Sequence, residues 1–148
     1  MSRASEGQPP RVLLFTGKGG VGKTTTAAAT AVHLAAAGQR VLATSADPAH
    51  SLADSMDVAL GSAPTEVRPG CWAQQLDARE RLEESWNDIR EWMLEVLDWA
   101  GVAAIEAEEL AVVPGLDELF ALTELESLVA SGDYDAIVVD CAPTAETI

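Results

Sequence analysis

The chain has 148 residues, 48% of them hydrophobic, which fits one globular domain with an apolar core. Its net charge of −15 argues against nucleic acid and anionic membrane surfaces as partners. No stretch approaches the roughly 20 apolar residues that span a bilayer, and Cys71 and Cys141 are too far apart to indicate a disulfide framework or a zinc site. We therefore expect a protein of the reducing cytoplasm.

The first predicted elements follow a polar segment, residues 1–10, which we expect to be a disordered leader. Residues 12–15 are a continuous apolar run, as expected of a strand buried on both faces. After a glycine-rich loop, an alanine-rich stretch predicts a helix over about residues 23–37, with Gly38 as its C-terminal stop. Residues 41–44 then predict a second strand.

The second half continues the alternation of strands and helices. Residues 72–76 predict a weaker third strand, a helix is expected over about 117–130, and residues 136–139 predict a strong strand that ends at Asp140. This alternation predicts an α/β domain, with a mostly parallel sheet flanked by helices and a helical insertion before the last strand.

The insertion is acidic and carries apolar residues at helical spacing: Leu82, Trp86, Ile89, Met93, Val96 and Ala100. This stripe fits either core packing or a partner-binding face. The chain ends at Ile148, shortly after the last predicted strand, with no helix to cover that strand. Because a parallel strand needs both faces buried, we expect residues 11–148 to be the N-terminal part of a domain truncated at its C-terminus.

Both lysines of the chain lie in one loop, Gly17-Lys18-Gly19-Gly20-Val21-Gly22-Lys23-Thr24. This loop fits the phosphate-binding pattern G-x-x-x-x-G-K-[ST] at every position. Backbone N–H groups of such a loop surround phosphate oxygens, while Lys23 can reach the β and γ phosphates and the Thr24 hydroxyl can bind Mg²⁺. The sequence therefore predicts a site for a nucleoside triphosphate.

Three glycines of the loop also satisfy G-x-G-x-x-G, the dinucleotide fingerprint, and Asp47 stands where that fold places its ribose-binding acid. Lys23 and Thr24 favour the phosphate loop, because a dinucleotide offers them neither a γ-phosphate nor Mg²⁺. A glycine turn that binds nothing is the third interpretation.

Phosphoryl transfer also needs support for Mg²⁺ and a positioned water. Asp140 closes an apolar strand in the Walker-B manner and is the candidate acid beside the Mg²⁺. Asp47 follows the second strand, and its carboxylate could orient or deprotonate the attacking water. The alternative for Asp47 is that it caps the turn that begins at Asp47-Pro48.

These segments together resemble one family of ATPases. The loop Gly17–Thr25 resembles the deviant phosphate loop of the ParA/MinD/ArsA class. Asp47–Leu52 resembles the first switch of the arsenite-pump ATPases, ArsA, a family that includes the eukaryotic ATPase that delivers tail-anchored membrane proteins. Residues 114–118 resemble another family segment, and residues 140–147 its second switch. The resemblance covers about residues 11–148, the N-terminal half of a typical member, and implies a P-loop NTPase fold.

The resemblance implies a role for each matched residue. Lys18 would reach across a dimer interface to the partner's phosphates, and would join Asp47 and Lys23 in catalysis. Thr24 and Asp140 would hold Mg²⁺. The residues implied to bind ATP are Gly17, Lys18, Gly19, Gly20, Val21, Gly22, Lys23, Thr24, Thr25, Pro143 and Thr144.

The second switch departs from the family at Ala145-Glu146, where Gly-His usually follows Pro-Thr. We expect a Mg²⁺-dependent ATPase of the ArsA type that acts as a nucleotide-driven homodimer, with a membrane-protein or client partner bound through a C-terminal half. The alternatives are a ParA/MinD-like positioning ATPase and a nucleotide-binding regulatory module with weak hydrolysis.

Overall fold

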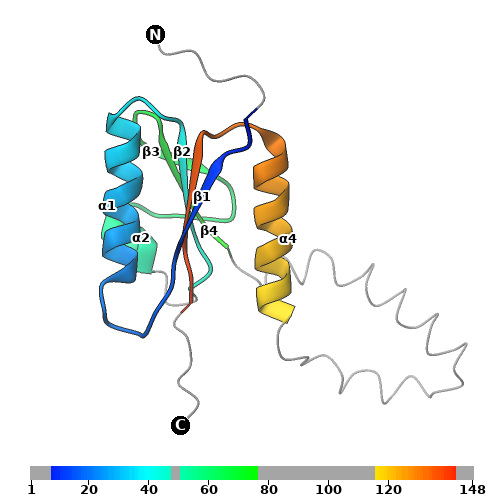
Figure 1. Ribbon diagram of the computed structural model, residues 1–148. Helices are drawn as coiled ribbons and strands as arrows, with labels where there is room; N and C mark the ends of the chain where they lie inside the picture. Colours follow the sequence, from blue (N-terminus) through cyan, green and yellow to red (C-terminus); the bar gives the residue numbers. More distant parts are fainter. Residues whose placement is uncertain (1–7, 48–50, 77–115, 143–148) are drawn as a thin grey trace, which may run out of the picture. The chain divides into compact units, whose positions relative to one another are not determined.

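The computed structural model describes residues 8–47, 51–76 and 116–142. Its strands belong to one sheet: β1 (Arg11–Phe15), β2 (Val41–Ser45), β3 (Thr65–Arg68), β4 (Cys71–Gln75) and β5 (Ala136–Asp140). Its helices are α1 (Lys23–Ala36), α2 (Ser51–Met56) and α4 (Leu116–Ser131), as Figure 1 shows. The sheet, α1 and α2 lie in one compact unit, Met1–Asp77 with Glu124–Ile148, and Ala78–Thr123 form a second unit.

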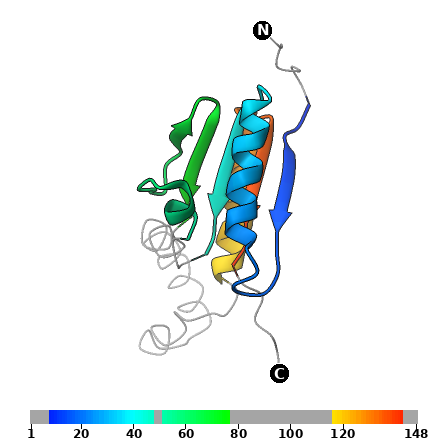
Figure 2. The same ribbon diagram turned by 90° about the vertical axis from the view of Figure 1, so that its left-hand side faces the viewer.

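The sheet has the strand order β1-β5-β2-β4-β3. The first four strands of this order are parallel, and β3 pairs antiparallel with β4 at the far edge. The helix α1 connects β1 to β2 and crosses over β5, which lies between them (Figure 2). The carboxyl ends of β1, β5, β2 and β4 therefore lie side by side, which is where ligands bind in open α/β sheets.

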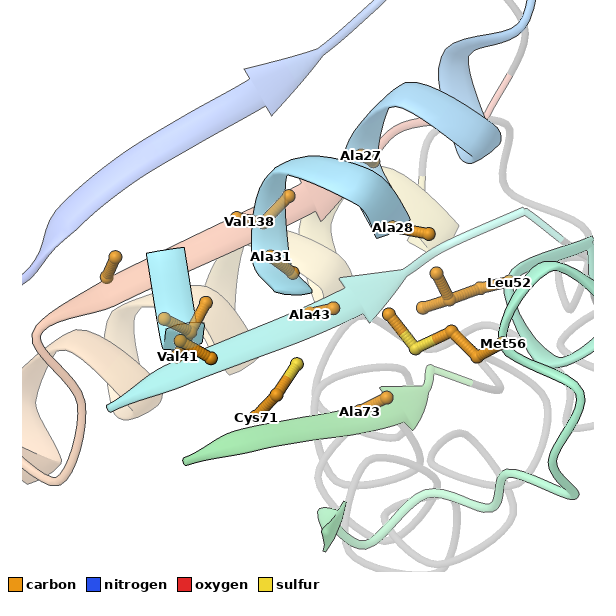
Figure 3. Packing of buried hydrophobic residues seen from close by; sticks show 12 residues of the cluster. Ala27, Ala28, Ala31, Val41, Ala43, Leu52, Met56, Cys71, Ala73 and Val138 are labelled. Carbon is orange, nitrogen blue, oxygen red and sulfur yellow. The ribbon is translucent and has the colours of Figure 1, made fainter. Parts of the chain in front are cut away.

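Small side chains hold α1 against the sheet. Alanine has the highest helix propensity, and its short side chain lets a helix approach a sheet closely. The buried face of α1 consists of Ala27, Ala28, Ala31 and Ala35. This face belongs to the same core cluster as Val41 and Ala43 of β2 and Val138 of β5 (Figure 3). The close contact fixes where α1 begins, and hence where the glycine-rich loop lies.

An ion pair joins the other end of the sheet. The Asp135 carboxylate accepts hydrogen bonds from the Arg40 backbone N–H at 2.8 Å and from its guanidinium at 3.2 Å. The backbone hydrogen bond, helped by the guanidinium and opposed by burial, lowers the pKa of Asp135. The stability it contributes is therefore present at neutral pH and is lost as the pH falls through this lowered pKa. The contact fixes the starting points of β2 and β5.

The predicted α/β class with a mostly parallel sheet is confirmed, and each predicted strand and the two helices near 23–37 and 117–130 are present with ends shifted by one residue at most. The helix α2 and the antiparallel strand β3 were not predicted. Residues 1–7 of the expected leader lie outside the described residues, and so does the apolar stripe of the acidic insertion, within 77–115. No helix in the described part of the chain is long and apolar enough to cross a membrane.

Two expectations about the sheet are wrong. The first strand is not buried on both faces, since Val12 is 38% and Leu14 58% exposed, and β1 also lies at an edge of the sheet. The last strand is not left uncovered either. All five residues of β5 are buried, and β5 pairs with β1 on one side and β2 on the other. The strand that is last in the chain inserts between the first two.

The open edge generates a prediction. Among the described residues β1 pairs with β5 alone, so its other side presents backbone groups that can pair with another chain. We expect the 148-residue chain to self-associate, and Leu14→Lys to shift it toward the monomer in sedimentation velocity. Leu122→Lys, at an equally exposed position on α4, is the control and should change nothing. A wild-type monomer at all concentrations would contradict the prediction.

Candidate active site

The glycine-rich loop runs from the end of β1 to the start of α1. Gly17, Gly20 and Gly22 have φ angles of 144°, 75° and 89°, which L-residues rarely adopt. A Cβ added to Gly20 or Gly22 would meet nothing within 4 Å, so these glycines are required by the backbone path and not by lack of space. The loop is largely exposed, and it places the backbone of its glycines at the carboxyl edge of the sheet.

The N-terminus of α1 is left open to an anion. Gly22 is the N-cap residue, so no side chain caps the helix, and its first turn contains no acid. The first N–H groups of a helix lack partners inside the helix and carry a partial positive charge. Lys23 adds a full charge here, and its Nζ donates a hydrogen bond to the Lys18 carbonyl at 2.9 Å. The Lys23 ammonium is thereby folded back over the loop, where phosphates are predicted.

A buried carboxylate lies next to the loop. The Thr24 hydroxyl donates a hydrogen bond to Asp140 Oδ2 at 2.7 Å, and the Ser45 hydroxyl donates to the same oxygen at 3.3 Å. Asp140 is 1% exposed, and its Oδ1 has no hydrogen-bond partner among the described residues. Leaving a buried polar atom unpaired costs about 1–3 kcal/mol. An oxygen in this position suits a cation or a water bound to it.

The oxygens of Thr24 and Asp140 are of the kind that binds Mg²⁺. Mg²⁺ prefers oxygen ligands and commonly keeps several waters while it binds one or two protein oxygens and the phosphates. The Thr24 hydroxyl and the unpaired Asp140 Oδ1 supply oxygens of this kind. No group of three or more His, Cys, Asp or Glu arranged for a metal occurs within the described ranges. A Mg²⁺ site at Thr24 and Asp140 would therefore need phosphate oxygens to complete it.

Asp47 follows β2 at the same edge of the sheet. Its backbone N–H donates to Ser45 Oγ at 3.2 Å, and its carbonyl accepts a hydrogen bond from Gln75 Nε2 at 2.7 Å. Side chains from two strands thus hold both backbone polar groups of Asp47. The residue is half-buried.

The structure brings most of the predicted site residues to one edge. The loop residues from Gly17 to Thr25 and Asp140 lie together, joined by the Thr24–Asp140 hydrogen bond. Asp47 is joined to Asp140 through Ser45. Residues 143–147 of the second switch, which include Pro143 and Thr144, and residues 48–50 of the first switch lie outside the described residues.

Ser45 and Gln75 belong to the site but were not among the residues that the sequence predicted. Each is the last residue of a parallel strand, and the register pairs Ser45 with Asp140 on one side and with Gln75 on the other. Their polar character at the carboxyl end of a buried strand indicates a position at the ligand-binding edge of the sheet. Which residues they contact depends on which strands are neighbours, and the sequence does not give this order.

The position of Cys141 generates a prediction. Burial raises the pKa of its thiol, and the Asp140 carboxylate raises it further, while the Lys23 ammonium lowers it. A raised pKa leaves less thiolate at neutral pH, so Cys141 should react with iodoacetamide more slowly in the folded chain than in urea. Lys23→Ala should slow it again. The buried Cys71 is removed as Cys71→Ala so that one thiol is read by mass spectrometry. Equal rates in folded and unfolded chain would disprove this assignment.

Comparison with known proteins identifies the family of the chain. The family described as anion-transporting ATPase matches residues 10–148. A protein of Prosthecochloris vibrioformis, provisionally named an arsenical pump-driving ATPase, is 44% identical over 138 residues, which cover 93% of this chain and 34% of that protein. A similarly named protein of Chlorobaculum tepidum is 42% identical over 138 residues, with the same coverage of both chains.

A more distant relative carries a different name. The ATPase ASNA1 homolog 1 of Paramecium tetraurelia is 35% identical over 147 residues, which cover 97% of this chain and 43% of that protein. The chain spans about a third of the length of the first two relatives. Since the family match covers nearly all of its residues, the chain belongs to the anion-transporting ATPase family, ArsA.

Proposed function

We propose that this chain binds ATP with Mg²⁺ at the loop Gly17–Thr24 and takes part in hydrolysis of the γ-phosphate bond, in a protein that acts as a homodimer in the cytoplasm. The observation that carries the proposal is the 2.7 Å hydrogen bond between Thr24 Oγ1 and Asp140 Oδ2, beside a buried Oδ1 without a partner in the described part of the chain. Membership of a family whose relatives are named as ATPases supports it.

The phosphates would bind at the start of α1. The Lys23 ammonium donates a hydrogen bond to the Lys18 carbonyl. A phosphate oxygen is the better acceptor, because its negative charge adds a direct Coulombic attraction to the ammonium that a neutral carbonyl does not offer. Lys23 would therefore exchange its carbonyl partner for the β and γ phosphates, while the uncapped N–H groups of α1 donate to the other oxygens.

Bound Mg²⁺ would neutralise charge on the β and γ oxygens and on the transition state. Thr24 would hold it through its hydroxyl oxygen, and Asp140 through its unpaired oxygen, directly or by way of a water. Ser45 donates to the other oxygen of Asp140 and so fixes the plane of the carboxylate. The Asp47 carboxylate would orient the attacking water and accept its proton.

Two other functions differ in partners or rate. A ParA/MinD-like positioning ATPase would share the loop and the chemistry, but the family match assigns the chain to the ArsA group. A nucleotide-binding regulatory module would bind ATP with little turnover. Measuring ATP binding and turnover on the same preparation separates this module from an ATPase.

The assignment of Asp47 is tested by Asp47→Asn in the full-length gene product. This change keeps the size and removes the charge, so ATP should bind nearly as before while turnover falls by about 10²-fold or more, since general-base positioning is lost. Lys23→Ala is the contrasting variant and should lose tight binding of ATP and Mg²⁺ in calorimetric titration. If Asp47→Asn turns over near the wild-type rate, Asp47 is only a turn-former.

Lys18 extends the proposal to the dimer. It is the one loop residue with a charged side chain that the general phosphate pattern does not require, and it is exposed. We propose that it acts on the nucleotide of the partner protomer, as an arginine finger does, where such a cation raises the rate about 10³–10⁵-fold. The alternative is a side chain that faces solvent at the rim of the loop.

Mixing two inactive variants tests action between protomers. Lys18→Ala should bind ATP but hydrolyse it slowly, and so should Asp47→Asn. A mixed dimer contains one site with an intact Asp47 and with a lysine from the other protomer, so activity should partly return on mixing. If mixed dimers form, as native mass spectrometry can establish, and no activity returns, Lys18 does not act across the interface.

A further inference from the structure

The buried side chain of Gln75, at the end of β4, binds the backbone that follows β2. It is 3% exposed, and its Nε2 donates two hydrogen bonds, to the Ser45 carbonyl at 3.2 Å and to the Asp47 carbonyl at 2.7 Å. Both partners are acceptors, so the NH₂ group of the amide must face them. The two N–H groups of one side chain therefore hold the backbone on both sides of Ala46.

The same short segment is held from the opposite side. The Ala46 N–H donates to the Asp140 carbonyl at 3.2 Å, and the Asp47 N–H donates to Ser45 Oγ. The N–H of Ala46 still bonds to the backbone of β5, whereas the N–H and the carbonyl of Asp47 bond to the side chains of Ser45 and Gln75. Of these contacts, the 2.7 Å bond from Gln75 is made to the carbonyl of Asp47 itself.

We propose that Gln75 is a positioning residue for Asp47. By fixing the peptide that follows Asp47, its amide sets the direction in which the carboxylate leaves the backbone, and hence where that carboxylate meets the attacking water. The inference rests on the proposed role of Asp47 in hydrolysis. Misplacement of a reacting group by about 1 Å can reduce a rate about 10²-fold, so a single anchor of this kind can limit turnover.

The chain provides a matched control beside Gln75. Gln74 is also a glutamine of β4, is 0% exposed, and like Gln75 has an Oε1 without a hydrogen-bond partner among the described residues. Because successive side chains of a strand point to opposite faces, its Nε2 contacts Thr44 Oγ1, at 3.5 Å, and not the Asp47 segment. Replacing either glutamine removes one buried amide, but only replacement of Gln75 removes the hydrogen bond to the Asp47 carbonyl.

The experiment compares Gln75→Met with Gln74→Met in the full-length gene product. Methionine is unbranched and of similar length but donates no hydrogen bond. We expect Gln75→Met to lower kcat about 10- to 100-fold with little change in ATP affinity, in line with a misplaced catalytic group. Gln74→Met should leave kcat close to that of the wild type. Hydrogen exchange at the Asp47 amide should accelerate in Gln75→Met alone.

A double variant shows whether Gln75 acts through Asp47. In an Asp47→Asn background, Gln75→Met should add almost no further loss of kcat, because the group it positions is gone. Losses that multiply would overturn the inference, and so would a normal kcat for Gln75→Met. If Gln75→Met does not fold, Gln75→Asn takes its place, since it keeps a buried amide but withdraws the donor by one methylene.

The outcomes separate the inference from the function on which it rests. If the wild type hydrolyses no ATP, or Asp47→Asn turns over normally, the proposed function fails first. If the wild type is active, Asp47→Asn is slow and Gln75→Met is normal, the function stands and the positioning role is rejected.

Discussion

The insertion of β5 between β1 and β2 is the constraint on which the candidate site depends. The register that follows places four strand-end residues, Phe15, Asp140, Ser45 and Gln75, in one row across the sheet. Asp140 then lies beside the strand that leads into the glycine-rich loop, so that Thr24 can donate to it. A shift of β5 by one residue would turn Asp140 to the other face and break this contact.

The row contains a buried carboxyl group, Asp140, and the described residues give a hydrogen-bond partner to only one of its two oxygens. Thr24 and Ser45 both donate to one oxygen of Asp140, and the other oxygen has no partner within the described residues. Burial of an unpaired polar atom opposes folding, so such an arrangement is expected where a ligand completes it. The same hydroxyl of Ser45 reaches the Asp47 backbone, and so one contact network joins the loop, the β5 acid and the segment after β2.

The apolar core sets the position of the loop that faces this row. Alanines on α1 let the helix lie close to β2 and β5, and the N-terminus of α1 is therefore held next to the carboxyl ends of these strands. The Arg40–Asp135 contact at the opposite end fixes where β2 and β5 start. The packing of α1 and the Arg40–Asp135 contact thus both fix β2 and β5 relative to the glycine-rich loop.

The sequence by itself determined what depends on local pattern. Glycines with a following Lys23-Thr24 predict a phosphate loop, and apolar runs and alanine content predict strands and α1, because these signals lie within a few residues. Tertiary structure decided what depends on strand order. It places β1 at an exposed edge and β3 antiparallel at the other edge, and it lets Ser45 and Gln75 form hydrogen bonds with Asp47. Residues 30 positions apart become neighbours only through pairing of β2 with β4, and no local pattern carries that information.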